Sequence, residues 1–186
     1  MKLRRWQQKV IDEFPEITKN YKKFILKAPT GAGKTVLASE IINRFYKNKK
    51  IVVLCHRLVL LEQLEKGLST DHKVKKLGLS EEGTPFENYD VLISTNLRSR
   101  DFLQNAIKHC DLLIIDEAHR VSPNGQAYKE LLDQFDKESA EQSKLLGLTA
   151  SPERRTGDQK DQLGLAFDAI IDLSLIHISE PTRRLI

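Results

Sequence analysis

The stretch Ala28-Pro29-Thr30-Gly31-Ala32-Gly33-Lys34-Thr35 decides the fold, because it joins an apolar run to an amphipathic one. Phe24-Ile25-Leu26 precedes it, and Lys34–Tyr46 carries an apolar stripe at helical spacing. A glycine-rich turn between a strand and a helix lets backbone N–H groups approach a phosphate closely, and the start of the helix adds partial positive charge. The stretch therefore predicts a strand, a phosphate-binding loop and a helix.

Each residue type in this loop suits one part of a nucleotide. Lys34 is expected to neutralise the β- and γ-phosphates, and the Thr35 hydroxyl is expected to hold Mg²⁺. The usual pattern begins with glycine, whereas this loop begins with Ala28. Gly31 and Gly33 would make the turn, and Thr30 and Ala32 are expected to bind the nucleotide with them. The strand–loop–helix context favours a nucleotide site over an ordinary glycine-rich turn.

Further apolar runs continue the pattern along the chain. They are Ile51–Leu54, Val91–Ile93, Leu112–Ile115 and Leu145–Leu148, and helices are expected at Leu58–Leu68, Asn96–Lys108 and Gln126–Lys137. The apolar runs are continuous rather than alternating, which is typical of strands buried on both faces of a parallel sheet. The fold class predicted is α/β, a doubly wound and mainly parallel sheet flanked by helices. Gly78–Asn88 is expected to form a surface loop.

Two acids, Asp116 and Glu117, directly follow the run Leu112–Ile115. Ligands of α/β sheets bind at the carboxyl ends of the strands, so these acids should face the same crevice as the phosphate loop. Asp116 would be a second Mg²⁺ anchor, and Glu117 would be the base that orients or deprotonates the attacking water. The structural alternative is a helix N-cap by Asp116, with Glu117 favouring the helix dipole.

Composition sets outer limits on the kind of protein. The chain has 186 residues, of which 40% are hydrophobic and 30% charged, with a net charge of +4, so a globular protein is expected. Its two cysteines, Cys55 and Cys110, lie far apart, which argues against a disulfide framework or a metal site and fits a cytoplasmic location. No signal peptide and no membrane span are expected.

The sequence resembles the first RecA-like motor domain of the superfamily 2 helicases. Asp116-Glu117-Ala118-His119 matches the Asp-Glu-Ala-His spelling of motif II, and Ala28–Thr35 resembles motif I. The resemblance implies that ATP and Mg²⁺ bind here, and that ATP hydrolysis is coupled to movement along nucleic acid.

Other motifs of that domain follow in order. Leu3–Gln8 is similar to the glutamine motif, in which Gln7 would contact adenine. Cys55–Gln63 resembles motif Ia and Ser94–Leu97 the next motif, so Arg57 and Thr95 would contact nucleic acid. A solvated charge remains the alternative for Arg57, and a helix N-cap for Thr95. Leu148–Pro152 resembles motif III, where Ser151 replaces the commoner Thr, and coupling of ATP to the bound strand is expected of His119, Thr149 and Ser151.

The spelling of Leu146–Arg154 is similar to the branch that contains type III restriction subunits, excision-repair helicases and RadD-like proteins. That branch implies DNA rather than RNA as the partner. Three alternatives stay open: a DNA-translocating subunit of a restriction system, an RNA helicase, and a nucleotide-binding switch without motor activity. A further alternative is a module that binds nucleic acid without hydrolysing ATP.

The resemblance covers residues 1–172, which we expect to form the ATP-binding domain. Residues 173–186 resemble no part of a motor: Leu173–Arg183 matches the in-frame translation of a transposase-type sequencing adapter. The alternative is a genuine last strand from Ile170 to Ile178. The family's second motor domain, with its arginine finger, has no counterpart in this sequence. Such arginines contribute about 10³–10⁵ in rate in related NTPases, so little turnover is expected from these residues alone.

Overall fold

A computed structural model gives the structure of residues 3–55, 58–78, 81–95, 100–118, 126–150, 166–172 and 184–185. One sheet organises all of them, in the strand order β3-β4-β2-β5-β6-β1-β7-β8. Strands β1 to β7 run parallel to their neighbours, and β8 is antiparallel to β7. The strands are β1 (Lys23–Lys27), β2 (Ile51–Cys55), β3 (Val74–Lys76), β4 (Val91–Thr95), β5 (Leu112–Asp116), β6 (Lys144–Thr149), β7 (Ala169–Asp172) and β8 (Arg184–Leu185).

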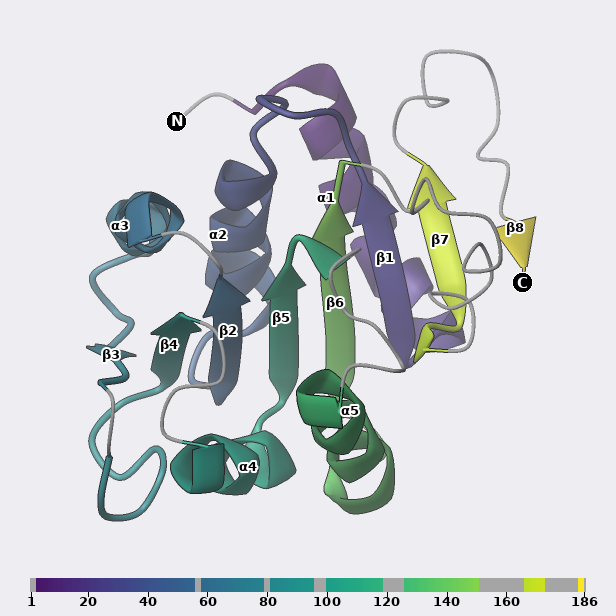
Figure 1. Cartoon of the computed structure of the whole chain (residues 1–186). Helices are drawn as coiled ribbons and strands as arrows, with labels where there is room; N and C mark the ends of the chain where they lie inside the picture. Colours follow the sequence, from purple (N-terminus) through teal and green to yellow (C-terminus); the bar gives the residue numbers. More distant parts are fainter. Residues whose placement is uncertain are drawn as a thin grey trace.

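Helices cover both faces of this sheet (Figure 1). They are α1 (Arg5–Asn20), α2 (Lys34–Phe45), α3 (Leu58–Gly67), α4 (Arg100–His109) and α5 (Gln126–Glu138). One core joins α1, α2 and α3 to strand residues such as Leu26 and Val53, and a second core joins α4 and α5 to Ile25 and Val52. Successive residues of one strand thus point into different cores, which explains the continuous apolar runs. The doubly wound parallel sheet predicted from the sequence is confirmed.

The structure reproduces all the strands expected from apolar runs and adds elements with weaker signals. Helix α1 was not assigned from the sequence, although Val10, Phe14 and Ile17 are buried along one side of it. The Phe14 ring stacks on Phe45 at 4.9 Å and meets Phe24 edge-on at 6.0 Å. These aromatic contacts fix α1 against α2 and β1, so the chain start lies beside the phosphate loop.

Strands β3 and β7 extend the sheet; β3 was not among the expected strands, whereas β7 overlaps the start of the alternative last strand, Ile170 to Ile178. β3 contains one apolar residue and two lysines, and it pairs only with β4 within the described structure. β7 pairs with β1, and the Lys27 ammonium contacts the Asp172 carboxylate at 2.7 Å across the two strand ends. Residues 173–183 of the predicted tail lie outside the described residues, and β8 pairs with Ala169 and Ile170 of β7.

The predicted helices agree closely with α2, α3 and α5. Helix α4 begins at Arg100, and residues 96–99 of the predicted Asn96–Lys108 helix lie outside the described structure. Residues 81–88 of the expected loop contain neither helix nor strand, and Gly83 turns there with a φ of 94°. Among the described helices, none is long and apolar enough to span a bilayer.

Candidate nucleotide site

The site lies at the carboxyl edge of three adjacent strands, β5, β6 and β1. Lys27, the last residue of β1, is level with Thr149 at the end of β6, and Asp116 at the end of β5 is level with Leu148. The Ala28 N–H donates to the Thr149 carbonyl over 2.9 Å, which extends the pairing of β6 into the first residue of the loop. The predicted phosphate loop, Asp116 of motif II and the described part of motif III therefore lie at one edge of the sheet, as expected for a doubly wound fold.

The loop turns through two glycines in the left-handed region. Gly31 has a φ of 71° and Gly33 a φ of 94°, a range that glycine adopts without the cost a side chain would bring. Helix α2 begins at Lys34, directly after Gly33. The Lys34 ammonium donates to the carbonyls of Ala28 and Pro29 over 3.1 Å and 3.2 Å, which places its charge above the loop. Thr30 is exposed, whereas Ala32 and Thr35 are half-buried.

Two side chains near the start of the chain, Arg4 and Gln7, donate hydrogen bonds to the phosphate loop, and we call this pair the brace. The Arg4 guanidinium donates to the carbonyls of Gly31 and Ala32 over 3.4 Å and 3.1 Å. The Gln7 amide donates to the Gly33 carbonyl over 3.0 Å, and its oxygen accepts the Arg4 N–H over 2.8 Å. The adenine contact of Gln7 stays a prediction, and Arg4, which lies in the same predicted motif, has no sequence signal for its contact with the loop.

The acids of motif II are half-buried at the end of β5. Glu117 leaves the strand with a φ of 54°, so its backbone turns sharply away from the sheet. Burial raises the pKa of the Cys55 thiol to about 12, and the nearby Asp116 carboxylate adds to that rise. Asp116 is the last residue of β5, and a negative oxygen ligand at a strand end suits Mg²⁺. The glycine cradle, the lysine and this carboxylate together fit a magnesium nucleotide.

The remaining predicted residues are placed only in part. The Thr149 side chain is fully buried, and Thr95, at the end of β4, is 8% exposed. Thr95 stands at the same sheet edge as the loop, but most of its surface is covered by the protein. Arg57, His119 and Ser151 lie outside the described residues, so their predicted roles stay predictions.

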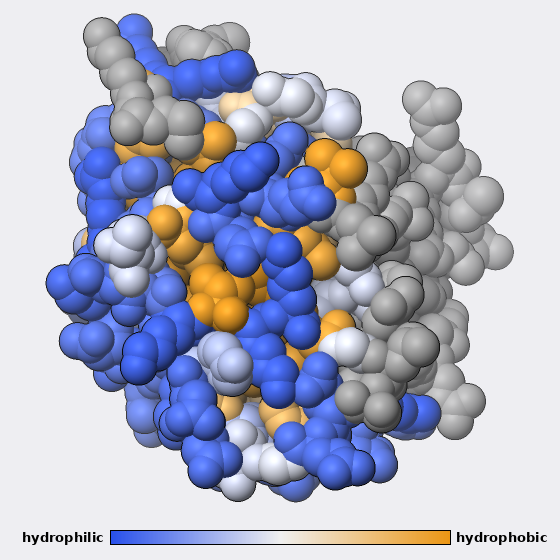
Figure 2. Space-filling model, turned by 90° about the vertical axis from the view of Figure 1, so that its left-hand side faces the viewer, coloured by the Kyte–Doolittle hydropathy of each residue, from blue (hydrophilic) through white to orange (hydrophobic). Residues whose placement is uncertain are grey.

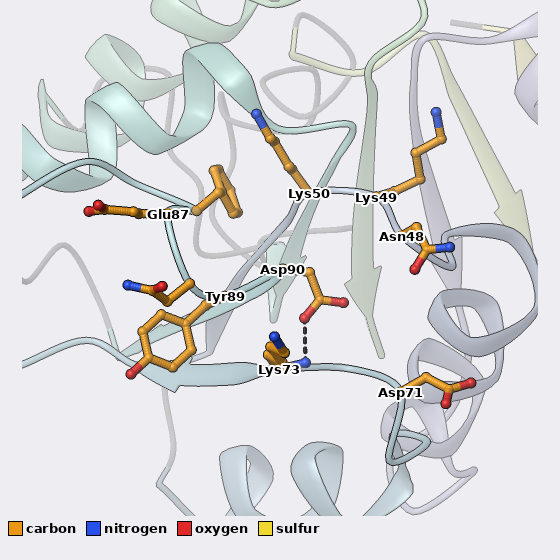
Figure 3. Close-up of a pocket in the computed structure, with 10 residues that line it drawn as sticks. Asn48, Lys49, Lys50, Asp71, Lys73, Glu87, Tyr89 and Asp90 are labelled. Atoms are coloured by element: carbon orange, nitrogen blue, oxygen red, sulfur yellow. Dashed lines mark hydrogen bonds between the residues drawn. The ribbon is translucent and has the colours of Figure 1, made fainter.

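A second hollow lies at the opposite, amino edge of the sheet, and it differs chemically from the loop. This pocket of about 340 Å³ is lined by residues around the starts of β2, β3 and β4, including Lys50, Lys73 and Asp90 (Figure 3). Asp90 accepts the Lys73 backbone N–H and lies 2.6 Å from His72 Nδ1, so it fastens β3 to β4. Another acid that lines the pocket, Asp71, contacts the Lys47 ammonium at 2.9 Å. The pocket lacks the glycine cradle that a triphosphate needs.

The face covered by α3 is mainly hydrophilic, with apolar side chains grouped near its centre (Figure 2). Val59 on α3 is 62% exposed, which is high for a large aliphatic side chain. Val59 lies within the predicted motif Ia, two residues after Arg57.

Comparison with known proteins decides the family. A model described as "Type III restriction enzyme, res subunit" matches residues 1–154. The chain belongs to this family. IRC3 of Saccharomyces cerevisiae, named as a candidate ATP-dependent helicase, is 30% identical over 183 residues, which cover 91% of this chain and 26% of that protein. The chain is thus homologous to superfamily 2 helicase motor domains, and it spans about a quarter or less of the curated relatives it matches.

Solved structures share the fold. The Hef helicase domain of Pyrococcus furiosus superimposes with a TM-score of 0.64 at 24% identity, covering 92% of this chain and 40% of that one. The SWI2/SNF2 ATPase core of Sulfolobus solfataricus, solved in complex with double-stranded DNA, gives a TM-score of 0.61 at 18% identity and covers 82% of this chain and 32% of that one. These likenesses establish a RecA-like architecture.

Proposed function

We propose that this chain is the ATP-binding motor domain of an ATP-dependent DNA translocase or helicase. The observation that carries the proposal is the meeting of the phosphate loop with Asp116 and Thr149 at one edge of three adjacent strands. Motifs Ia and III argue against a plain nucleotide switch, which has no use for them. Membership of a family that includes restriction motor subunits supports the same reading.

Each residue has a stated part in this proposal. Lys34 holds the β- and γ-phosphates, while Thr35 and Asp116 hold Mg²⁺. The metal, when bound, screens negative charge as it develops on the phosphates. Glu117 orients or deprotonates the attacking water, and the cradle of Thr30, Gly31, Ala32 and Gly33 supplies backbone donors. The brace, which includes Gln7, completes the nucleotide site.

The proposed motor function implies two partners, a nucleic acid and a second motor domain. Nucleic acid, DNA rather than RNA, is bound through Arg57 and Thr95, and His119, Thr149 and Ser151 couple it to the nucleotide. A second motor domain supplies the arginine that fast hydrolysis requires, so this domain alone turns over slowly. The two cysteines are free and buried, in accord with a reducing, cytoplasmic setting.

A DNA-translocating subunit of a restriction system is the second candidate function. The family model describes such a subunit, and the motor chemistry of the two candidates is the same. They differ in whether the motor drives a nuclease or separates strands. Strand-separation and cleavage assays on the longer protein would distinguish them.

The first prediction tests the nucleotide site. Lys34→Ala should weaken Mg²⁺-ATP binding at least about tenfold, since a charge-assisted hydrogen bond contributes about 1.5–3 kcal/mol and a tenfold change corresponds to about 1.4 kcal/mol. Titration calorimetry on the 186-residue chain measures this. Lys19→Ala, which removes an exposed lysine at the far end of α1, is the matched control. Equal affinity of Lys34→Ala and the unmodified chain would rule out this site.

A further inference from the structure

The phosphate loop begins with Ala28 and Pro29, which we call its root. The Ala28 N–H donates to the Thr149 carbonyl over 2.9 Å. The carbonyls of both root residues accept the Lys34 ammonium, over 3.1 Å and 3.2 Å. The Pro29 carbonyl also accepts the Ala32 N–H over 3.2 Å, which closes the turn. The position of the root therefore sets the position of the ammonium that is proposed to hold the phosphates.

An ion pair holds the residue that precedes the root. Lys27 is the last residue of β1, and its ammonium contacts the carboxylate of Asp172, the last residue of β7, over 2.7 Å. The two side chains are 30% and 19% exposed, so solvent screens this pair less than a fully exposed one. The peptide bond from Lys27 to Ala28 is planar and stiff. A shift of the Lys27 backbone therefore moves the Ala28 N–H with it.

The ion pair belongs to a polar row that crosses three neighbouring strands. Lys27 is in register with Thr149 of β6 on one side and with Asp172 of β7 on the other. Side chains alternate between the faces of a strand, and Ile25 packs into the core with α4 and α5, so Lys27 lies on that face too. Thr149 is fully buried. The end of β1 is thus held from both of its neighbours, β6 and β7, which lie on either side of it (Figure 1).

We propose that Lys27 and Asp172 are positioning residues for the nucleotide site, and that their ion pair fixes the root of the phosphate loop where it binds a triphosphate. The inference rests on the proposed function and adds to the site two residues that lie in none of the motifs identified in the sequence. A carboxylate at the edge where an anion binds would by itself oppose that binding. Because Lys27 offsets the charge of Asp172, the carboxylate contributes through the loop that it positions.

A direct role and a positioning role for Lys27 predict opposite results at Asp172. If Lys27 contacts the phosphates itself, Lys27→Met weakens nucleotide binding, and Asp172→Asn strengthens it by releasing the ammonium. If the ion pair positions the root, both substitutions weaken binding by the same factor, and the double variant is no worse than either one. If the pair only fastens β7 to β1, both substitutions lower the melting temperature and neither changes the affinity of the folded protein.

The experiment measures the affinity of the 186-residue chain for Mg²⁺-ATP by titration calorimetry, at a temperature where melting curves show every variant folded. Lys23→Met is the matched control, because it breaks the 2.9 Å ion pair between Lys23 and Asp136 at the other end of the same strand. Lys27→Arg keeps the positive charge and should bind nearly as well as the unmodified chain.

We expect Lys27→Met, Asp172→Asn and the double variant each to lower the affinity about threefold, and Lys23→Met to leave it unchanged. Should Lys27→Met melt too early to be titrated, the sign of the change in Asp172→Asn decides by itself. Tighter binding by Asp172→Asn, additive losses in the double variant, or unchanged affinity in both single variants would overturn the inference and leave the proposed function intact. Binding that ignores Lys34→Ala, or no nucleotide binding by the unmodified chain, would overturn both.

Discussion

Glu117 is the proposed catalytic base, and its backbone has an unusual conformation. It follows the last residue of β5 and has a φ of 54°, a conformation that is uncommon outside glycine, asparagine and aspartate. Such strain persists at functional sites because the surroundings determine the backbone there. The unusual turn thus supports the proposed role of Glu117 beside the phosphate loop.

The proposed base leads to a prediction for the longer protein that contains this domain. Glu117→Gln should lower ATP turnover by about 10²–10⁴ and spare ATP binding, because glutamine keeps the shape and loses the proton acceptor. Steady-state hydrolysis and nucleotide titration measure the two effects separately. Hydrolysis near the unmodified rate would remove Glu117 from the mechanism. Lys34→Ala is the comparison, since it should impair binding as well.

The residue types of the site could be predicted from the sequence, but the brace could not. A glycine-rich loop that opens a helix and two acids at a strand end are local patterns, and the strand order then brings them together. Arg4 contacts the loop from 27 and 28 residues away, through backbone carbonyls that carry no side-chain signature. Only the packing of α1 against α2 places Arg4 there.

At the scale of elements, strands with continuous apolar runs were predictable and those at the margins were not. β3 has a single apolar residue, Val74, because an edge strand buries less surface. β7 is four residues long and overlaps the alternative strand Ile170 to Ile178, of which residues 173–178 lie outside the described structure. In α1 the apolar spacing of Val10, Phe14 and Ile17 was a usable signal, and Pro15 with the polar residues around it obscured it.

Strand β6 depends on a glycine at its centre. A Cβ atom at Gly147 would lie 2.9 Å from the Ala118 Cβ, 3.0 Å from Ile25 and 3.1 Å from Phe167. Gly147→Ala should therefore destabilise the domain by about 1–3 kcal/mol through overpacking. Urea unfolding measures the change. Adding Ala118→Gly removes one clashing atom and should recover part of the loss; an unchanged midpoint for Gly147→Ala would contradict the packing described here.

For the molecule as a whole, the proposed binding of DNA predicts how its DNA affinity changes with salt concentration. Single-stranded DNA should bind without base preference and with an affinity that falls as salt rises, because contacts to phosphates release counterions. Arg57→Ala with Thr95→Ala should weaken binding, whereas Arg5→Ala should not. Fluorescence anisotropy across a salt series measures both effects. Affinity that is independent of salt, or equal in the double variant, would count against this surface.

The last residues of the chain give a stability prediction. We propose that residues 173–186 are foreign to the domain, and β8 lies at the edge of the sheet, where β7 is its partner among the described strands (Figure 1). An added edge strand is not required by a sheet that is complete without it. Deleting residues 174–186 should leave the melting temperature unchanged or raise it. A large fall would show that the segment belongs to the fold.

The placement of β1 has a consequence for how the protein is made. β1 lies between β6 and β7, so Lys23 pairs with Leu145 and Phe24 pairs with Ala169, more than a hundred residues further along the chain. During synthesis the ribosome releases β1 early, and the strand must wait for both partners until almost the whole domain has emerged. Pairing over such sequence distances slows folding and leaves an apolar strand uncovered meanwhile. The strand that leads into the phosphate loop therefore stays without its sheet partners for longer than β2, which pairs with β4 and β5.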